Sequence, residues 1–311
     1  MEQREQRKEI PISEIGGVRI GHAQDQEAKT GVTALLFPGG ARVGVHVSGG
    51  GPASRETRLA DPLTADNPVN GIVFSGGSAY GLAAADGVMR YLEEHGVGYD
   101  TGYARVPLVC QSCIYDLGVG RADLRPDGAM GYAACKDAEQ NRPVWGSVGA
   151  GCGATVGKIC GMERASRGGL GIYGVQIGKL MMAAVVVVNA LGDIFDPKSG
   201  RKIAGLRGED GRGFADSRQE MYRISRETDL FTGNTTVGAV ITNGKFGKAE
   251  MCKLAAMAGN GYARCIDPVG TMADGDTIYA ASVGDVEADI NMAGTLAAEV
   301  VAEAIIKAVT S

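Results

Sequence analysis

The pattern of apolar and polar positions predicts a chain in which strands and helices are mixed. Residues 180–188 form the most apolar run, rich in β-branched side chains, and predict a buried central strand. The turn-prone pair Gly233-Asn234 leads into a second apolar run, residues 235–241, and predicts a loop that feeds another buried strand. Three segments have the spacing and composition of helices: residues 82–94, 248–260 and 292–309. The predicted fold class is therefore α/β.

Two segments near the N-terminus, the second of them strictly alternating, predict a β-hairpin. Residues 33–37 and 42–47 both have the character of strands. Between them, Pro38-Gly39-Gly40 is typical of a turn. We therefore expect the second segment to return alongside the first.

Glycine is the unusual feature of the composition. It accounts for 49 of 311 residues, which is about twice the usual fraction. Because these glycines are spread through apolar segments, they predict tight turns and close backbone approaches in a compact fold. Residues 197–230 are polar and glycine-rich, and predict a long exposed loop with one short helix over residues 217–226. The length fits either two domains or one large α/β domain.

The charges and the cysteines argue against several classes of protein. The net charge is −5 without a basic block, so nucleic acid is not expected as a partner. No stretch reaches the ~18 apolar residues of a membrane span, and the charged first nine residues do not resemble a signal peptide. The seven cysteines do not form paired clusters. These features predict a cytoplasmic protein with reduced thiols and no membrane contact.

Two glycine-rich segments look like phosphate-binding loops, but their spacing differs. Residues 75–81 lie between a predicted strand and a helix without the G-x-G-x-x-G spacing. Close backbone packing and the binding of an anion or substrate both stay open for them. Residues 149–159 lack one glycine and the Ser or Thr of a phosphate loop. Lys158 is the only charge in residues 144–162, which favours a lysine that lies in a cleft.

The Asn234–Thr235 junction places a nucleophile at the start of a predicted strand. If this bond is cleaved, Thr235 becomes an N-terminus that carries both a hydroxyl group and an α-amine. An α-amine has an ordinary pKa near 8 and can serve as the base for the hydroxyl. The alternative is that Asn234-Thr235-Thr236 is only a turn followed by a strand.

Three polar residues at strand ends are candidates for supporting roles. Asn189 follows the central strand, where its amide either points into a cleft or only forms a turn. Asp274 and Asp276 flank Gly275 at the entrance to another strand. This pair could form a metal loop or a turn, or could accept hydrogen bonds from an ammonium group.

Histidine chemistry and metal chemistry are not indicated. Each of the three histidines lies in a segment that explains it structurally, and no G-x-S-x-G motif is present. His and acidic residues do not cluster as a metal site requires. A site made of Thr235, its amine, Lys158, Asp274 and Asp276 needs no histidine. We therefore expect no metal and no cofactor.

Taken in order, these motifs resemble the self-processing aminopeptidases of the DmpA type, which include β-peptidyl aminopeptidases, and their relatives the nylon-oligomer (6-aminohexanoate-oligomer) hydrolases. The resemblance covers nearly all the chain from about Ile15. It implies a four-layer αββα sandwich like that of the N-terminal-nucleophile hydrolases. It also implies a single domain that cleaves itself into residues 1–234 and 235–311, which stay together and assemble as homo-oligomers such as tetramers.

The resemblance also implies roles for individual residues. Thr235 corresponds to the nucleophile, and Asn234 to the residue before the cut. Asn189 corresponds to the asparagine of the oxyanion site, where one donor can contribute ~3–4 kcal/mol. Tyr115 corresponds to a tyrosine near the substrate.

The remaining correspondences point to the nylon-hydrolase branch. Lys158 matches its active-site lysine, and Asp274 and Asp276 match the acidic pair that orients the threonine amine and hydroxyl. The aminopeptidases usually have a serine nucleophile and a Ser-Gly-acidic motif where this chain has Asp274-Gly275-Asp276. Residues 54–57, in contrast, look more like the aminopeptidases.

The sequence thus predicts a self-cleaving N-terminal-threonine amidohydrolase that forms an acyl-enzyme. The expected partner is a small-molecule or short-oligomer amide, either a short peptide or an ω-amino-acid oligomer. Three alternatives stay open: a strict N-terminal aminopeptidase, a self-cleaving threonine acyltransferase, and a non-catalytic binder of small molecules.

Overall fold

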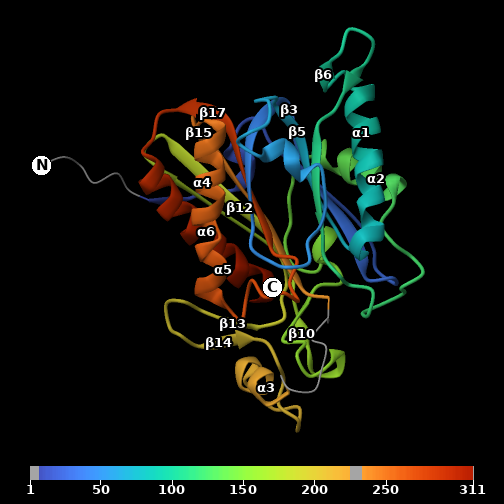
Figure 1. Cartoon of the computed structure of the whole chain (residues 1–311), viewed down its shortest axis with the longest axis vertical. Coiled ribbons are helices and arrows are strands. Elements are labelled where there is room, and N and C mark those ends of the chain that lie inside the picture. The colour runs from blue at the N-terminus through green and yellow to red at the C-terminus, as the bar shows by residue number, and fades with distance from the viewer. Residues whose placement is uncertain (1–6, 225–232, 311) are drawn as a thin grey trace, which may run out of the picture.

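The structure is a computed structural model that describes residues 7–224 and 233–310. Within these ranges, two sheets lie face to face between two layers of helices (Figure 1). The first sheet contains β1 (Lys8–Glu9), β11 (Gly169–Ile177), β12 (Leu180–Asn189), β15 (Thr235–Gly244), β17 (Thr277–Val286) and the second half of β3 (Thr30–Val47). The second contains β2 (Arg19–Asp25), the first half of β3, β5 (Val69–Ser75), β8 (Val109–Cys113) and β4 (Ala53–Arg55).

Helices cover the outer face of each sheet. The first sheet is covered by α4 (Lys248–Ala258), α5 (Asn260–Cys265) and α6 (Ile290–Thr310), and the second by α1 (Ala84–Glu94) and α2 (Gly128–Ala138). This order is the predicted αββα arrangement.

Shorter elements connect these layers. The short strands are β6 (Tyr99–Asp100), β7 (Arg105–Val106), β9 (Thr155–Val156), β10 (Ser166–Arg167), β13 (Asp193–Phe195), β14 (Lys202–Ala204) and β16 (Ile266–Asp267). The short helices are η1 (Ile12–Glu14), η2 (Thr57–Ala60), η3 (Ser78–Ala83), η4 (Gly149–Gly151), η5 (Met162–Arg164) and α3 (Ser217–Ile224). The helix predicted over residues 217–226 therefore corresponds to α3, and its last two positions lie outside the described residues.

The alternation of side chains along β12 explains why its sequence is apolar throughout. Val185 and Val187 face the second sheet, whereas Val186 and Val188 face the helices α4 to α6. A strand that is buried on both faces reads as a continuous apolar run. By the same alternation, the next odd-numbered position, Asn189, projects toward the space between the sheets.

The predicted hairpin at residues 33–47 is wrong. The structure has one continuous strand, β3, which pairs with β2 and β5 through its first half and with β17 through its second half. Pro38-Gly39-Gly40 lies where the register shifts between Leu36 and Ala41, and Gly40 has φ +78°. The turn-forming residues thus let one strand pass from the second sheet to the first.

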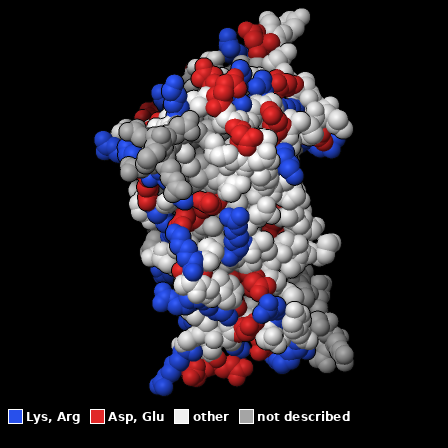
Figure 2. All heavy atoms as spheres, turned by 90° about the vertical axis from the view of Figure 1, so that its left-hand side faces the viewer, with Lys and Arg blue, Asp and Glu red and all other residues white. Residues whose placement is uncertain are grey.

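Within the described residues, no helix is both long and apolar enough to cross a membrane. On the face shown in Figure 2, acidic and basic side chains are intermixed beside an uncharged area.

Candidate active site

The Asn234–Thr235 junction lies at the end of the first sheet, where β15 begins. Thr235 is paired in register with Asn189 of β12, and its side chain is on the same face as Val237, toward the second sheet. Thr235 is only 5% exposed, and its Oγ1 donates a hydrogen bond to the carbonyl oxygen of Asn234. The hydroxyl group therefore lies next to the bond that the sequence predicts to be cleaved.

Gly233, directly before Asn234, adopts a backbone conformation that other residues rarely adopt. Its φ is +62°, a conformation that favours glycine. A Cβ atom at this position would lie 2.4 Å from Cγ of the Tyr115 ring. A larger residue would therefore collide with Tyr115, which ties the predicted substrate-binding tyrosine to the segment before Thr235.

The carbonyl oxygen of Asn234 has a second donor. The backbone N–H of Gly275 donates to it at 2.8 Å, and the N–H of Asn234 donates to the carbonyl of Ala273 at 3.4 Å. Asn234 and Asp274 form a parallel bridge between the two segments. An amide aimed at a carbonyl oxygen stabilises the negative charge that develops there when a nucleophile adds to the carbonyl carbon.

Asp274 and Asp276 are buried on either side of this amide. Oδ2 of Asp274 accepts from the backbone N–H of Thr271 at 2.9 Å and from its Oγ1 at 2.6 Å. Asp276 accepts from the N–H of Thr236 at 2.5 Å and from that of Gly270 at 2.9 Å. Burial raises the pKa of both carboxyl groups. For Asp276, burial and the neighbouring charge of Asp274 together raise the pKa to about 7.

Lys158 is also buried, with 3% exposure. Its Nζ donates to the carbonyl oxygen of Asn189 at 2.9 Å and to that of Gly233 at 3.3 Å. Burial lowers its pKa to about 7, while the charges of Asp274, Asp116 and Asp276 act in the opposite direction. Lys158 is therefore buried and not on the open surface, while its predicted position in a cleft stays a prediction.

Asn189 connects three segments of the site. Its Nδ2 donates to the carbonyl oxygen of Tyr115 at 3.0 Å, and its Oδ1 accepts from the N–H of Thr155 at 3.0 Å. The predicted role of Asn189 as an oxyanion donor stays a prediction. What the geometry provides is an amide side chain held directly opposite Thr235.

The structure thus brings all seven predicted site residues to one end of the first sheet. Two contributing groups were not predicted: the amide of Gly275 and the carboxylate of Asp116. Gly275 was interpreted only as the spacer between two acids, although a Cβ there would lie 3.0 Å from both Thr235 Oγ1 and Gly51 O. Asp116 lies three residues after the end of β8 at Cys113, and an acid shortly after an apolar strand is the signal that could have found it.

No group of three or more His, Cys, Asp or Glu side chains is arranged to hold a metal ion in residues 7–224 and 233–310.

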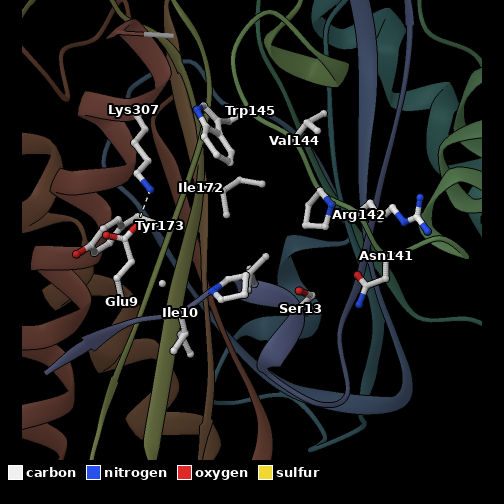
Figure 3. A pocket seen from close by; sticks show the side chains of 14 residues that line it. Glu9, Ile10, Ser13, Asn141, Arg142, Val144, Trp145, Ile172, Tyr173 and Lys307 are labelled. Atoms are coloured by element: carbon white, nitrogen blue, oxygen red, sulfur yellow. Dashed lines mark hydrogen bonds and ion pairs between the residues drawn. The ribbon is translucent and has the colours of Figure 1, made fainter. Parts of the chain in front are cut away.

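A separate hollow of about 520 Å³ lies between β1, β11 and residues 141–145 (Figure 3). Lys307 of α6 pairs with Glu9 at 2.7 Å, and its Nζ lies 5.2 Å from the ring centre of Trp145 and 4.9 Å from that of Tyr173. None of the predicted site residues lines this hollow, so it is distinct from the candidate active site.

Comparison with solved structures identifies the class of fold. The beta-aminopeptidase of Burkholderia sp. superimposes with a TM-score of 0.68 and 20% sequence identity, over 96% of this chain and 85% of that one. The L-aminopeptidase D-Ala-esterase/amidase of Ochrobactrum anthropi, described as a variant of the Ntn-hydrolase fold, gives a TM-score of 0.69 and 17% identity over the same shares. The chain therefore has the fold of the N-terminal-nucleophile hydrolases, as predicted.

Sequence comparison identifies the family. An uncharacterized aminopeptidase of Mycobacterium tuberculosis strain H37Rv is 38% identical over 291 residues, which are 88% of this chain and 82% of the relative. The 6-aminohexanoate-oligomer endohydrolase of Kocuria sp. strain KY2 is 32% identical over 274 residues, or 87% and 74% of the two chains. The sequence model of peptidase family S58 matches residues 11–311, and the chain therefore belongs to this family. The predicted resemblance is thereby confirmed.

Proposed function

We propose that this protein is a self-cleaving amidohydrolase whose nucleophile is Thr235 in its N-terminal form. The observation that carries the proposal is the pair of hydrogen bonds on the carbonyl oxygen of Asn234, one from Thr235 Oγ1 and one from the Gly275 amide. The nucleophile and a donor for the developing charge thus meet at a single peptide bond.

In the first stage the chain cleaves itself. Thr235 Oγ adds to the carbonyl carbon of Asn234 through a five-membered ring, and the oxyanion is stabilised by the Gly275 N–H. The hydroxyl proton passes through the buried group of Lys158, Asp274 and Asp276, where two pKa values lie near 7. The C–N bond then breaks, the Thr235 nitrogen takes up a proton, and water hydrolyses the resulting ester to leave the Asn234 carboxylate.

In the second stage the same oxygen acts on a substrate. The new α-amine of Thr235 takes the hydroxyl proton as Oγ attacks a substrate amide. The amine product leaves with a proton, and water releases the acyl group from Oγ. The β-methyl group of threonine restricts χ1 and so helps to hold Oγ in one direction.

The substrates that we propose are amides of short peptides and of ω-amino acids, including 6-aminohexanoate oligomers. Two similarities support this range. The relatives include proteins named as aminopeptidases and proteins named as 6-aminohexanoate-oligomer endohydrolases. The Asp274-Gly275-Asp276 motif resembles the second group, which favours tolerance of longer, flexible acyl chains.

The test compares Thr235→Ala with Thr235→Ser. Each variant is incubated with p-nitroanilides, β-peptides and linear 6-aminohexanoate oligomers, with free and with acetylated N-termini. We expect no turnover from Thr235→Ala and partial turnover from Thr235→Ser, because serine keeps the hydroxyl group. Turnover by Thr235→Ala would move the nucleophile elsewhere, with Thr236 as the first candidate. Loss of all wild-type cleavage on acetylation would make the protein a strict aminopeptidase.

A further inference from the structure

A third buried carboxylate, that of Asp116, lies within the same end of the fold. Asp116 is 2% exposed. It accepts a hydrogen bond from the backbone N–H of Gly77 and another from Oγ1 of Thr30, both at 2.7 Å. Thr30 begins β3, and Gly77 lies in the turn after β5. A buried charge is costly unless it is both hydrogen-bonded and paired with an opposite charge. These two bonds satisfy the first condition, so the question is which cation the Asp116 carboxylate acts on.

Both glycine-rich segments that look like phosphate loops pack against this carboxylate. A Cβ at Gly76 would lie 1.9 Å from Oδ2 of Asp116, and a Cβ at Gly153 would lie 2.9 Å from its Cβ. Any side chain at either position would occupy the space of Asp116. The amide of Gly77 does bind an anion, as glycine-rich turns often do, but the anion is part of the chain itself.

The segments that surround Asp116 also contain, or contact, the predicted catalytic residues. Asp116 directly follows Tyr115, whose carbonyl oxygen accepts from Asn189 Nδ2 at 3.0 Å. Gly153 lies two residues before Thr155, whose N–H donates to Asn189 Oδ1 at 3.0 Å, and five residues before Lys158. A shift of Asp116 would therefore be transmitted to Asn189 and Lys158 together.

The charge of the Asp116 carboxylate acts on Lys158. Lys158 is faced by Asp274, Asp116 and Asp276, in decreasing order of their effect on its pKa. Asp116 in turn is faced by Lys158 and by the thiols of Cys113 and Cys152. Burial raises the pKa of both thiols, so they stay neutral near pH 7. Lys158 is therefore the cation on which the charge of Asp116 acts.

We propose that Asp116 is a positioning residue of the active site, whose carboxylate, held by the two glycine-rich segments, keeps Lys158 able to exchange a proton beside the Asn234–Thr235 bond. The proposal rests on the function proposed above. Without Asp116, the burial of Lys158 is opposed by fewer negative charges, and the lysine becomes neutral at a lower pH.

The test measures the titration of Lys158 directly, in the full-length Thr235→Ala chain so that cleavage cannot interfere. Lysine labelled with ¹³C at Cε gives an NMR signal for Lys158 that is assigned by its loss in Lys158→Met. Asp116→Asn removes the charge but can still accept from Gly77 N–H and donate to Thr30 Oγ1. We expect this substitution to lower the titration midpoint of Lys158 by about 1 pH unit. In the cleaving chain, the limb of the pH–rate profile that belongs to Lys158 moves in the same direction.

Two further variants keep the test decisive. Asp193→Asn changes another buried carboxylate that is not among the charges acting on Lys158, and should lower the thermal midpoint while the Lys158 titration stays in place. Thr30→Val keeps the Asp116 carboxyl group but removes one of its donors, which raises the pKa of that carboxyl group and makes it less ionised. It should therefore lower the titration midpoint of Lys158, as Asp116→Asn does, but by less. This variant tests the proposal if Asp116→Asn does not fold.

A folded Asp116→Asn or Thr30→Val chain with an unchanged Lys158 midpoint would overturn the proposal. If wild-type protein proved uncut and inactive while the Lys158 midpoint still moved, the proposed function would fail and the placement of Asp116 would stand.

Discussion

Two buried ionic centres in this molecule, one at Asp193 and one at Lys158, both combine aspartate with lysine but differ in the ratio of acids to bases. Asp193 of β13 pairs with Lys202 of β14 at 2.6 Å, and also accepts from the N–H of Leu206 and from the N–H and Oγ of Ser217 at 2.7–2.9 Å. One acid thus meets one base, and four donors satisfy its oxygens. At the Asn234–Thr235 junction, three carboxylates act on the single Lys158.

We propose that the difference separates a structural tie from a group that exchanges protons. The Asp193 centre fastens β13, β14 and the start of α3 to one another, and its charges balance. At Lys158 the acids outnumber the base, and burial brings the pKa values of Lys158 and Asp276 together near 7. Groups with pKa values near the working pH are suited to general acid–base catalysis. The following substitutions test whether this contrast holds.

The largest expected contrast comes from removing each lysine. Lys158→Met should leave the chain uncut and lower turnover by about 10²–10⁴-fold, because the proton-exchanging group loses its base. Its unfolding free energy should change less than that of Lys202→Met, because burial raises the pKa values of the carboxyl groups beside Lys158, and these groups can take up protons when the lysine is absent. Lys202→Met should instead lower the unfolding free energy by about 3–5 kcal/mol, because Asp193 is left buried without its cation. Denaturant unfolding and a denaturing gel measure both effects.

The contrast would be contradicted by the reverse result, in which Lys158→Met is unstable but Lys202→Met is stable and inactive. Lys202 would then belong to the proton-exchanging group and Lys158 to the structural ion pair.

The next effect concerns Asn189. Asn189→Ala should fold and lose about 10²–10³-fold in turnover if its Nδ2 donates to the oxyanion during the reaction. In the uncut chain this nitrogen donates to the carbonyl of Tyr115. Steady-state rates on a p-nitroanilide substrate measure the effect. Unchanged turnover would make Asn189 a structural link between Thr155 and Tyr115.

A smaller effect is expected from adding one methyl group at each centre. In Gly275→Ala the new Cβ lies 3.0 Å from Thr235 Oγ1 and Gly51 O, so the Gly275 backbone or these neighbours must shift, which disturbs the placement of Thr235 Oγ1 and of the Gly275 amide at the Asn234 carbonyl. Self-cleavage should slow by at least about tenfold. In Gly205→Ala the new Cβ lies 2.2 Å from Oδ1 of Asp193 at φ +143°, which should cost stability by about 1–3 kcal/mol and leave cleavage intact. Equal cleavage rates in both variants would count against the Gly275 amide as a donor.

The smallest effect at neutral pH belongs to a third buried group, His22. Burial lowers the pKa of its ring to about 4, against the opposing charge of Asp137. Because this folded-state pKa lies below the ordinary 6.5, its contribution to stability is complete above pH 6.5 and is lost as the pH falls toward 4. The loss is on the order of 3 kcal/mol at most. Denaturant unfolding from pH 7 to pH 4, with His22→Gln as the control, separates this acid effect from the titration of the Lys158 site. An equally steep acid dependence in His22→Gln would assign the loss to other groups.

The parts of the fold that were predictable are those whose signal is local. The burial of β12 on both faces can be predicted from the continuous apolar run at residues 180–188. The helix α6 can be predicted from the pattern of residues 292–309. The hairpin at residues 33–47 was mispredicted because a Pro-Gly-Gly sequence looks the same in a turn and in an irregular strand. Which of the two forms depends on partners far along the chain, β5 and β17.

The same distinction holds at the site. The positions of Thr235 and Asn189 at strand ends could be predicted because each borders an apolar run: Thr235 begins β15 and Asn189 ends β12. Their pairing in register could not be read from either segment alone. Gly275 and Asp116 were missed because their importance lies in what they contact: the carbonyl of Asn234, and the glycines at positions 76 and 153.

The most direct test of the central claim is the intact mass of the purified wild-type chain beside Thr235→Ala, with N-terminal sequencing of each fragment. We predict two wild-type fragments, residues 1–234 and 235–311, the second beginning Thr-Thr-Val, and one uncut chain for Thr235→Ala. An active wild-type protein that stays in one piece, or one that is cut at a different bond, would contradict the assignment of Thr235.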